Sequence, residues 1–423
     1  MTINTAEVFD SELKMTVGCT DPGAVAYAAA KASSLLDGEL SGLDILLSRS
    51  IYKNAVCVGI PGIKKNGIEY AALLGAMVRK PELKLAVLGA VNEAMLGQLE
   101  EAVKKIPVTV ACIDCEEVLY IRVACQSSTS VSKVVISGDY DRISSVEKDN
   151  ECLYRQDPVI KNPSASYEGW DLKSIWDAAL SGETDYGPLI NYEAINKKAG
   201  GILTGAEKEN PVHGLVNGKS LCTGEMAALA RIYVLNTGKR RMSGEVVPVV
   251  SVAGSGNLGI LSMLAVSAVC DFLGISQEER GKALCLSVLI TIYIKNQMNR
   301  LTVMCGTALA GAAGAASAIA YLLGGGLPEI EMAINTILGS IGGLLCDGAK
   351  ESCAFKVGFA AELAVVSGAM AADCKGIKPG GGIITHEIDK NIRNVGHINN
   401  KGMREVDNII LEILHTQKKT GRL

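Results

Sequence analysis

The sequence has few aromatic residues, few histidines and no excess of basic charge. Aromatic residues make up only 4% of the 423 residues, so small aliphatic side chains must fill the interior, and 46 glycines allow close backbone approaches. None of the four histidines has a ligand-like partner nearby in the sequence, which disfavours a histidine-based zinc site. The formal net charge of -4 provides no basic stripe for phosphates, so a small solute is a better partner than nucleic acid.

The chain also lacks the features of a secreted or membrane-spanning protein. Its first residues include acids and no apolar run of the kind that forms a secretory signal. The 13 cysteines are an odd number scattered along the chain, which favours a reducing compartment and predicts a cytoplasmic protein. Two uncharged stretches, 246–270 and 301–328, are long enough to span a membrane. Their Gly, Ala and Ser content and the absence of an aromatic belt indicate buried helices instead.

The periodicity of apolar residues predicts an α+β protein with two domains. Residues 1–210 are expected to form an N-terminal α/β layer with short strands and, from 148 onward, a polar connector. Residues 211–423 are rich in Ala, Gly and Leu and are expected to form a large all-helical domain.

Local patterns predict individual elements of the N-terminal layer. Asp21 as N-cap, followed by Pro22 and an Ala-rich run, predicts a helix over 21–36. Further helices are expected over 69–79 and 90–105. Short apolar and β-branched runs predict strands at AVCVGI (55–60), KLAVLG (84–89), VTVACI (108–113), LYIRVAC (119–125) and KVVISG (133–138).

Three cysteines in the C-terminal half form a candidate metal centre. Cys346 and Cys353 lie seven residues apart around a polar turn, and Cys305 lies 41 residues before Cys346. Three thiolates can hold a cubane iron-sulfur cluster and leave its fourth iron open, where it acts as a Lewis acid. From spacing alone, three small core residues of an Ala/Gly-rich helical bundle explain the pattern equally well.

These segments also carry a family resemblance that runs over nearly the whole chain. The sequence resembles the L-cysteine desulfidase family, which is related to the iron-sulfur L-serine dehydratase alpha-chain family. The most specific match is CDGAK-x-SC. The matching stretches are VGCTDP at 17–22, KNAVCVGIPG at 53–62, GSGNLG at 254–259, TIYIK at 291–295, RLTVMCG at 300–306 and CDGAKESCAFK at 346–356.

The resemblance implies a catalytic centre and a reaction. It implies a 4Fe-4S cluster held by Cys305, Cys346 and Cys353, and Cys19 as a general base or acid. It also implies a lyase that eliminates hydrogen sulfide from L-cysteine without pyridoxal phosphate and leaves pyruvate and ammonia. An oxygen-sensitive enzyme of cysteine catabolism is the expected result.

The position of Cys19 supports a chemical role independently of the resemblance. It directly precedes a predicted helix, and a thiol at a helix N-terminus has its pKa lowered. We therefore expect a thiolate that could take the α-proton of a bound amino acid. A partly buried cysteine with a structural role is the alternative.

The glycine run at 254–259 matches a dinucleotide fingerprint, but the match is weak. No complete βαβ pattern surrounds it, and the next acid, Asp271, comes too early to bind a ribose. Backbone N–H groups with Ser255 and Asn257 at a helix start are better suited to holding a substrate carboxylate. Close helix packing is the structural alternative.

Four other residues complete the predicted substrate-binding set. Lys53, Asn54 and Lys295 are polar groups within apolar stretches, and Thr20 directly follows Cys19. Lys350 is a further candidate. Structural ion pairs explain the lysines about as well as substrate contacts do.

Other chemistries have weaker support. Pyridoxal phosphate would catalyse the same elimination, but the glycine runs at 323–327 and 379–384 lack an accompanying lysine segment. The lone pair Cys112 and Cys115 has no second pair, so redox or zinc chemistry there is disfavoured. A non-catalytic iron-sulfur protein for sensing or electron transfer is another alternative.

One departure from the family pattern leaves the substrate open. Tyr140 and Asp141 stand where the resemblance predicts a His-Thr-like segment. L-serine or another β-substituted amino acid is therefore an alternative to L-cysteine. We expect no nucleic-acid or membrane partner, and we expect the chain to assemble with itself as a dimer.

Overall fold

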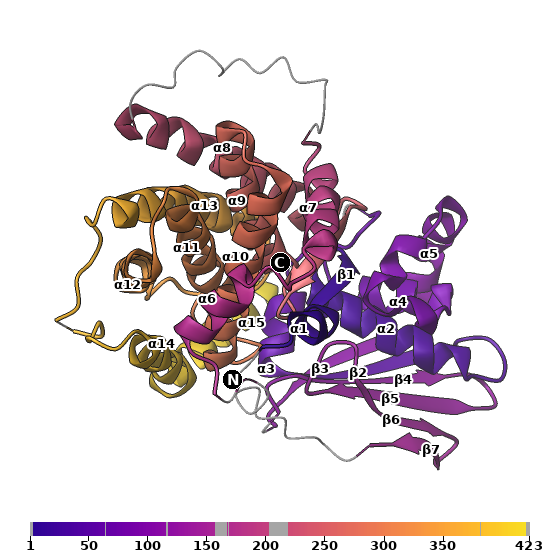
Figure 1. Ribbon diagram of the computed structural model, residues 1–423. Helices are drawn as coiled ribbons and strands as arrows, with labels where there is room; N and C mark the ends of the chain where they lie inside the picture. The colour runs from indigo at the N-terminus through magenta and orange to yellow at the C-terminus, as the bar shows by residue number, and fades with distance from the viewer. Residues whose placement is uncertain are drawn as a thin grey trace.

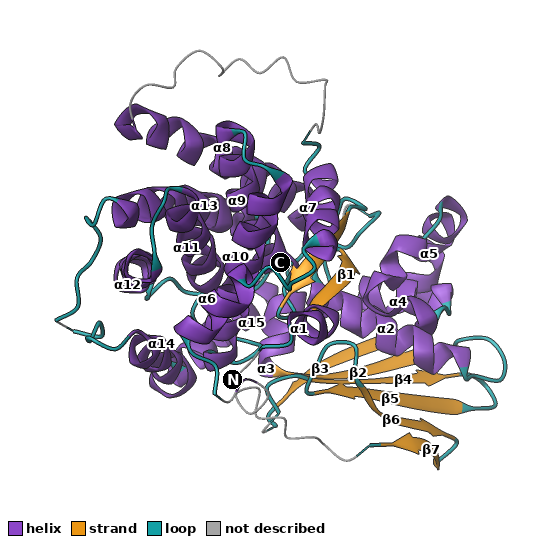
Figure 2. Cartoon of the chain, in the orientation of Figure 1, coloured by secondary structure: helices purple, strands orange, loops and turns teal. Residues whose placement is uncertain are grey.

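The computed structural model describes residues 3–63, 65–115, 117–156, 167, 169–202, 219–380 and 382–419 (Figure 1). A mixed six-stranded sheet forms the base of the N-terminal part, and helices dominate the C-terminal part (Figure 2). The predicted α+β class is confirmed.

The sheet has the strand order β3-β2-β4-β5-β6-β7. Strands β2 and β3 are parallel, and all other neighbouring pairs are antiparallel. Helices α2 (Thr20–Ser34) and α4 (Ile68–Val78) lie on one face of the sheet (Figure 1). The strands are β2 (Gly42–Ser48), β3 (Val108–Ile113), β4 (Tyr120–Gln126), β5 (Val131–Ser137), β6 (Ile143–Lys148) and β7 (Glu151–Arg155).

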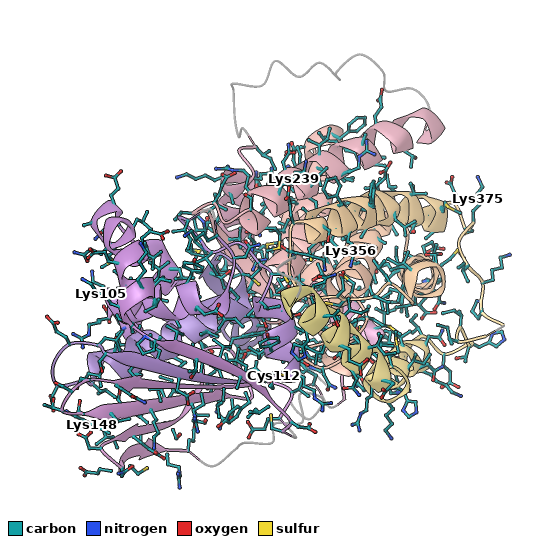
Figure 3. The ribbon with its side chains drawn as sticks, turned by 180° about the vertical axis from the view of Figure 1, so that it is seen from behind. Lys105, Cys112, Lys148, Lys239, Lys356 and Lys375 are labelled. Carbon is teal, nitrogen blue, oxygen red and sulfur yellow. The ribbon has the colours of Figure 1, made fainter. Side chains whose placement is uncertain are left out.

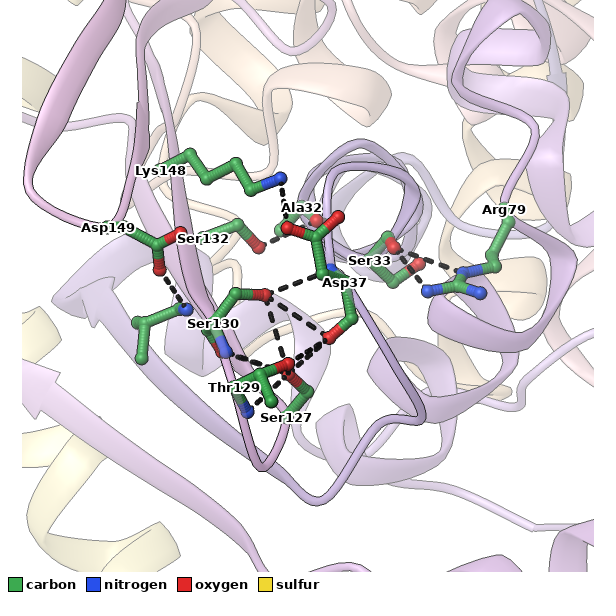
Figure 4. A network of polar contacts seen from close by, with 11 residues as sticks. Ala32, Ser33, Asp37, Arg79, Ser127, Thr129, Ser130, Ser132, Lys148 and Asp149 are labelled. Carbon is green, nitrogen blue, oxygen red and sulfur yellow. Dashed lines mark hydrogen bonds and ion pairs between the residues drawn. The ribbon is translucent and has the colours of Figure 1, made fainter.

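Hydrogen bonds from the β4–β5 turn fix the chain that follows α2 (Figure 4). Ser127 and Thr129 donate their hydroxyls to the Asp37 carbonyl at 2.6 and 2.9 Å. The Asp37 N–H donates to Ser130 Oγ at 2.9 Å, and Lys148 pairs with the Asp37 carboxylate at 2.8 Å. The C-terminal end of α2 is therefore tied to the sheet.

Two of the five predicted strands are wrong. Residues 84–89 belong to the 3-10 helix η1 (Pro81–Ala90), and residues 55–60 contain the end of α3 (Arg49–Ala55) followed by bends. Most apolar side chains of both runs are buried, and periodicity cannot distinguish a short buried helical turn from a strand. The strands predicted over 108–113, 119–125 and 133–138 are confirmed.

The predicted N-terminal helices are confirmed with shifted ends. Helices α4 and α5 (Glu93–Lys105) match the two expected after the first helix. Helix α2 begins one residue earlier than predicted, with Cys19 instead of Asp21 as N-cap. The Asp21 side chain is thereby placed in the first turn, where it faces the site described below.

One large hydrophobic core joins most helices of the C-terminal part, whereas Leu411 of the last helix belongs to the core of the N-terminal part. It also includes α1 (Thr5–Glu12) and β1 (Leu13–Val17), which pairs antiparallel with β8 (Pro248–Val252). The helices are α8 (Lys219–Met242), α9 (Gly256–Leu273), α10 (Gln277–Gln297), α11 (Ala312–Leu322), α12 (Leu327–Ile341), α13 (Ser352–Ala372), α14 (Ile388–His397) and α15 (Arg404–Lys419), with the π-helical turns η3 (Thr307–Gly311) and η4 (Ile398–Gly402).

The two described helices of the predicted connector also pack into this core, whereas its residues 151–155 form strand β7 of the sheet. Helices α6 (Leu172–Leu180) and α7 (Gly187–Ala199) bury Ile175 and Leu189 against it. The predicted boundary at residue 210 lies within 203–218, outside the described residues, and it stays a prediction.

Helices α9 and α13 are long and apolar enough to cross a membrane by length and composition. The most apolar window of α9 is 83% buried inside the protein, and that of α13 is 50% buried. Packing against neighbouring helices accounts for the apolar composition of α9, as expected for the stretch 246–270.

A buried network of four charges joins α7, α9 and α10. Lys197 Nζ lies 3.0 Å from both Glu193 and Asp271. Arg280 pairs with Glu193 at 2.6 Å and with Asp271 at 2.8 Å. Burial opposes ionisation of Asp271, but Lys197 and Arg280 outweigh it and hold its pKa well below the usual value. Each charge has two partners of opposite sign, so the network is balanced.

We predict that Asp271→Asn lowers the free energy of unfolding by about 3 kcal/mol at pH 7, because it leaves two buried cations with one partner fewer. The pKa of Asp271 is lower in the folded protein than in the unfolded chain, where it is about 3.9. Its ionised form therefore stabilises the fold above about pH 4, and this contribution is lost as the pH falls toward the folded pKa. The difference between wild type and variant in urea titrations should therefore shrink below about pH 4. Asp177→Asn, in an exposed pair with Lys173, is the control and should cost no more than about 0.5 kcal/mol. An equal loss in both variants would contradict the prediction.

Candidate functional site

A cavity of about 100 Å³ lies between the start of α2 and the loops and helix ends of the C-terminal part. Residues from both parts of the chain line it. Nine of the ten predicted site residues line it: Cys19, Thr20, Asn54, Ser255, Asn257, Lys295, Cys305, Cys346 and Cys353. The structure thus brings together residues that are up to 334 positions apart, although their roles stay predictions.

Backbone pairing places Cys305 beside Cys346. The Cys305 N–H donates to the Leu344 carbonyl at 2.6 Å, and the Cys346 N–H donates to the Val303 carbonyl at 2.7 Å. Between these two bonds, Met304 and Leu345 form an antiparallel bridge. In this register Cys305 lies opposite Leu344, and Cys346 comes two residues after Leu344. Residues two apart on a strand point to the same face, so the two cysteines are diagonal neighbours on one face.

The π-helical turn η4 supports this pairing through a buried asparagine. Asn399 Oδ1 accepts hydrogen bonds from the Val303 and Met304 N–H groups at 3.1 and 2.9 Å. Asn399 Nδ2 donates to the Met298 carbonyl at 2.9 Å. The side chain is only 2% exposed, so it holds the loop before Cys305 without access to solvent.

The third cysteine lies at the start of α13, after a turn organised by Asp347. Lys350 and Lys356 pair with the Asp347 carboxylate at 2.5 and 2.7 Å, and Lys356 is labelled in Figure 3. Burial opposes ionisation of Asp347, but these two lysines lower its pKa to about 2. Gly348 has a φ of +93°, and a Cβ there would lie 2.3 Å from the Lys53 carbonyl oxygen. The CDGAKESC turn therefore requires glycine at this position.

The donor set fits an iron-sulfur cluster. Burial and, next, the neighbouring Cys346 thiol raise the pKa of Cys305 to about 12, and Cys353 adds to this effect. Three neighbouring thiolates at Cys305, Cys346 and Cys353 would repel one another unless a positive charge lay between them. Bound iron supplies that charge. No three His, Cys, Asp or Glu side chains in the described ranges could hold a single metal ion. Thiolates that bind different irons of one cluster need not converge on one point.

The pKa predicted for Cys19 is wrong in direction. Burial, with a smaller contribution from the Asp21 carboxylate, raises it to about 12. Cys19 is the N-cap of α2, but its side chain makes no capping hydrogen bond, and it is only 4% exposed. The partial charge of the helix terminus is outweighed by the loss of solvation. In this structure Cys19 is therefore a thiol at neutral pH.

Asp21 lines the cavity as well, which its sequence context did not predict. Cys19 Sγ donates to Asp21 Oδ2 at 3.6 Å, while Tyr140 and Asn54 donate to Oδ1 at 3.2 and 3.4 Å. Burial raises the pKa of Asp21 to about 6, although these three donors oppose the shift. Its position two residues after Cys19 could have indicated a place in the site. However, Asp21 before Pro22 and an Ala-rich run also fits a helix N-cap, and it was interpreted as one.

Helix α9 begins at the cavity wall, as predicted from the glycine run. Ser255 is its N-cap, accepts from the Leu258 N–H at 3.4 Å and shares a hydrogen bond with Thr307. The preceding strand β8 pairs only with β1, in antiparallel orientation, so the parallel βαβ context of a dinucleotide site is absent from the described sheets.

The two predicted lysines have different surroundings. Lys295 lines the cavity and donates to the carbonyls of Asn299 and Arg300 at 2.6 and 2.9 Å. Burial, together with the Arg300 charge, lowers its pKa to about 7. Lys53 does not line the cavity, because it pairs with Asp407 of α15 at 2.6 Å. For Lys53 the structure shows the ion pair that was the alternative, and its substrate contact stays a prediction.

The Cys112–Cys115 pair lies at the edge strand β3, and Cys112 is labelled in Figure 3. Cys115 is exposed, and neither thiol lines the cavity. No metal-binding group of three forms around them among the residues the structure describes.

Comparisons with known proteins identify the family. Residues 174–412 match the family described as the serine dehydratase alpha chain. The whole chain is also similar to proteins named UPF0597, a name that states no activity. One from Methanocella arvoryzae is 35% identical, and the alignment covers 96% of each chain. One from Clostridium perfringens is 32% identical over 97% of each chain, and one from Bacteroides fragilis is 33% identical over 95% of each.

We predict that Cys305→Ser, Cys346→Ser and Cys353→Ser each remove most of the iron and acid-labile sulfide after anaerobic reconstitution, because a cluster needs its thiolate ligands. Iron and sulfide should be measured per polypeptide, together with the visible absorption. The control is Cys374→Ser, which changes an exposed thiol after α13. Full iron content in all three variants would exclude these residues as ligands.

Proposed function

Because the chain belongs to the family of serine dehydratase alpha chains, we propose that this lyase is an L-cysteine desulfidase. The proposed reaction is α,β-elimination of L-cysteine to pyruvate, ammonia and hydrogen sulfide. The observation that supports it best is the cavity, which collects three candidate cluster ligands, a buried thiol and several polar groups. The family resemblance implies the same combination of a cluster on three cysteines and a cysteine that moves a proton.

Cys305, Cys346 and Cys353 would hold the 4Fe-4S cluster. When bound, a cluster with three protein ligands supplies an open iron that acts as a Lewis acid toward the leaving group. The chain itself supplies polar groups on the other walls of the cavity. Asn54 comes from α3, and Lys295 comes from the end of α10. These groups orient the amino acid and exclude water from it.

Cys19 and Asp21 are suited to move the α-proton. At neutral pH the carboxyl group, with a pKa of about 6, is mostly ionised and accepts a hydrogen bond from the thiol. If Asp21 takes the thiol proton, Cys19 becomes the base that removes the proton at Cα. Tyr140 donates to the same carboxylate and occupies the place expected for a histidine. In this proposal Tyr140 positions Asp21 and does not itself carry the proton.

L-serine is the second candidate substrate, and the family description favours it. The same cavity would act on a hydroxyl leaving group. L-cysteine is preferred for two reasons. The motifs around Cys19 and Cys346 resemble those of desulfidases, and a soft thiolate is a better ligand for iron than a hydroxyl group is.

The reconstituted protein, assayed anaerobically, is expected to release sulfide, pyruvate and ammonia in equal amounts from L-cysteine. Turnover of L-serine should be at least about tenfold slower, measured as kcat/KM, which corresponds to about 1.4 kcal/mol. Faster turnover of L-serine would reassign the protein as a serine dehydratase. No product from either substrate with a full cluster would favour the sensing or electron-transfer alternative.

For Cys19 we expect that Cys19→Ser and Cys19→Ala keep the wild-type iron content but lose turnover by about 100-fold or more, as for removal of a general base. Cys57→Ser is a matched control, since this thiol lies in the same part of the chain but does not line the cavity. Iron content and sulfide release should be measured on the same samples. A Cys19 variant with near-normal turnover would remove this residue from the mechanism.

A further inference from the structure

We propose that Arg241 binds the α-carboxylate of the amino-acid substrate. The inference rests on the proposed function in assuming that the cavity accepts an amino acid. It adds a specificity-determining residue that the sequence analysis did not consider. Arg241 lies near the end of α8, next to Lys239 and Arg240, and basic residues at a helix C-terminus are ordinary. The sequence alone gives no sign that one of them is buried.

Arg241 is a buried cation without an acidic partner. It is 2% exposed and lines the cavity. Its Nη1 donates to Asn257 Oδ1 at 2.9 Å, whereas its Nε is buried with no hydrogen-bond partner. It forms no ion pair with any acidic residue in the described part of the chain. A buried guanidinium with an unpaired donor is costly, unless a bound anion supplies the missing acceptor.

The other two cations at the cavity already have acceptors in the protein, and Lys295 keeps one N–H group for the substrate. Arg300 donates to the Glu12 carboxylate from both terminal nitrogens, at 2.6 and 2.9 Å. Lys295 donates to two backbone carbonyls, as described above. Arg241 is therefore the guanidinium that remains for a substrate carboxylate among the described residues of the cavity.

The start of α9 completes the proposed carboxylate site. The guanidinium of Arg241 lies against Gly256, where a Cβ would come within 2.6 Å of Nε and 2.8 Å of Nη2. Gly256 therefore leaves the space in which the guanidinium lies. The first backbone N–H groups of an α-helix have no intrahelical acceptor and favour an anion. A carboxylate at this point would meet the guanidinium and the start of an 18-residue helix together.

The position also agrees with the proposed chemistry. The charge of Arg241 acts on both Cys19 and Asp21, so the guanidinium lies in the same electrostatic environment as the proton-transfer pair. An amino acid held by its carboxylate at Arg241 would bring Cα close to that pair. The two oxygens of a carboxylate suit the planar guanidinium, which donates two parallel hydrogen bonds.

The test compares ligands with and without a carboxylate. L-alanine and ethylamine share an amine and a methyl group, but only L-alanine carries the carboxylate. Their binding to the reconstituted protein should be measured anaerobically by calorimetry, alongside KM for L-cysteine. We expect Arg241→Gln to weaken L-alanine binding and raise KM by about 10- to 100-fold, with no change for ethylamine. Arg241→Lys, which keeps the charge without the planar fork, should show a smaller loss.

The matched control is Arg231→Gln on the same helix, where the arginine is partly exposed and pairs with Glu362. It should bind L-alanine like the wild type. Binding of L-alanine by Arg241→Gln within about twofold of wild type, or failure of the wild type to bind it, would overturn the inference. If Arg241→Gln does not fold, unchanged L-alanine binding by Arg241→Lys would overturn it as well. Arg241-dependent binding without release of sulfide or ammonia would support the carboxylate site and reject the proposed function.

Discussion

Two backbone hydrogen bonds between residues 303–305 and 344–346 are the constraint on which the site depends. They join loops from different helices and place Cys305 and Cys346 on one face. Asn399 locks the first loop, and Gly348 lets the second loop turn closely over α3. Side-chain changes in the surrounding helices can be absorbed by repacking, whereas these bonds involve the main chain itself.

The charges around the cavity divide into two groups. Lys350 and Lys356 are bound to Asp347, and Arg300 is bound to Glu12, so these ion pairs fix the walls. Asp21, Arg241 and Lys295 have hydrogen bonds to neutral or thiol groups and lack an ion-pair partner among the described residues. A substrate that carries both an ammonium and a carboxylate is complementary to the carboxylate of Asp21 and the guanidinium of Arg241.

Burial determines the chemistry of the proton-transfer groups more than helix position does. Cys19 lies at a helix N-terminus, as its sequence context indicates, but loss of solvation makes it a weaker acid. The same burial makes Asp21 a stronger base than a surface carboxylate. The pair therefore works, in the proposed mechanism, by exchanging one proton internally. The thiolate that removes the α-proton would form only when Asp21 takes the thiol proton, so no free thiolate is needed beforehand.

The α+β class, three helices of the N-terminal layer, the helical character of the C-terminal half, three of the five expected strands and the candidate ligands in CDGAKESC could be predicted from the sequence. These features depend on local periodicity and on short motifs, which are visible in neighbouring residues. The ion pair between Lys53 and α15, the positions of Asp21 and Arg241 at the cavity and the proton kept by Cys19 became visible only in the folded chain. Burial and ion pairing arise between residues far apart in the chain, so local sequence carries little information about them.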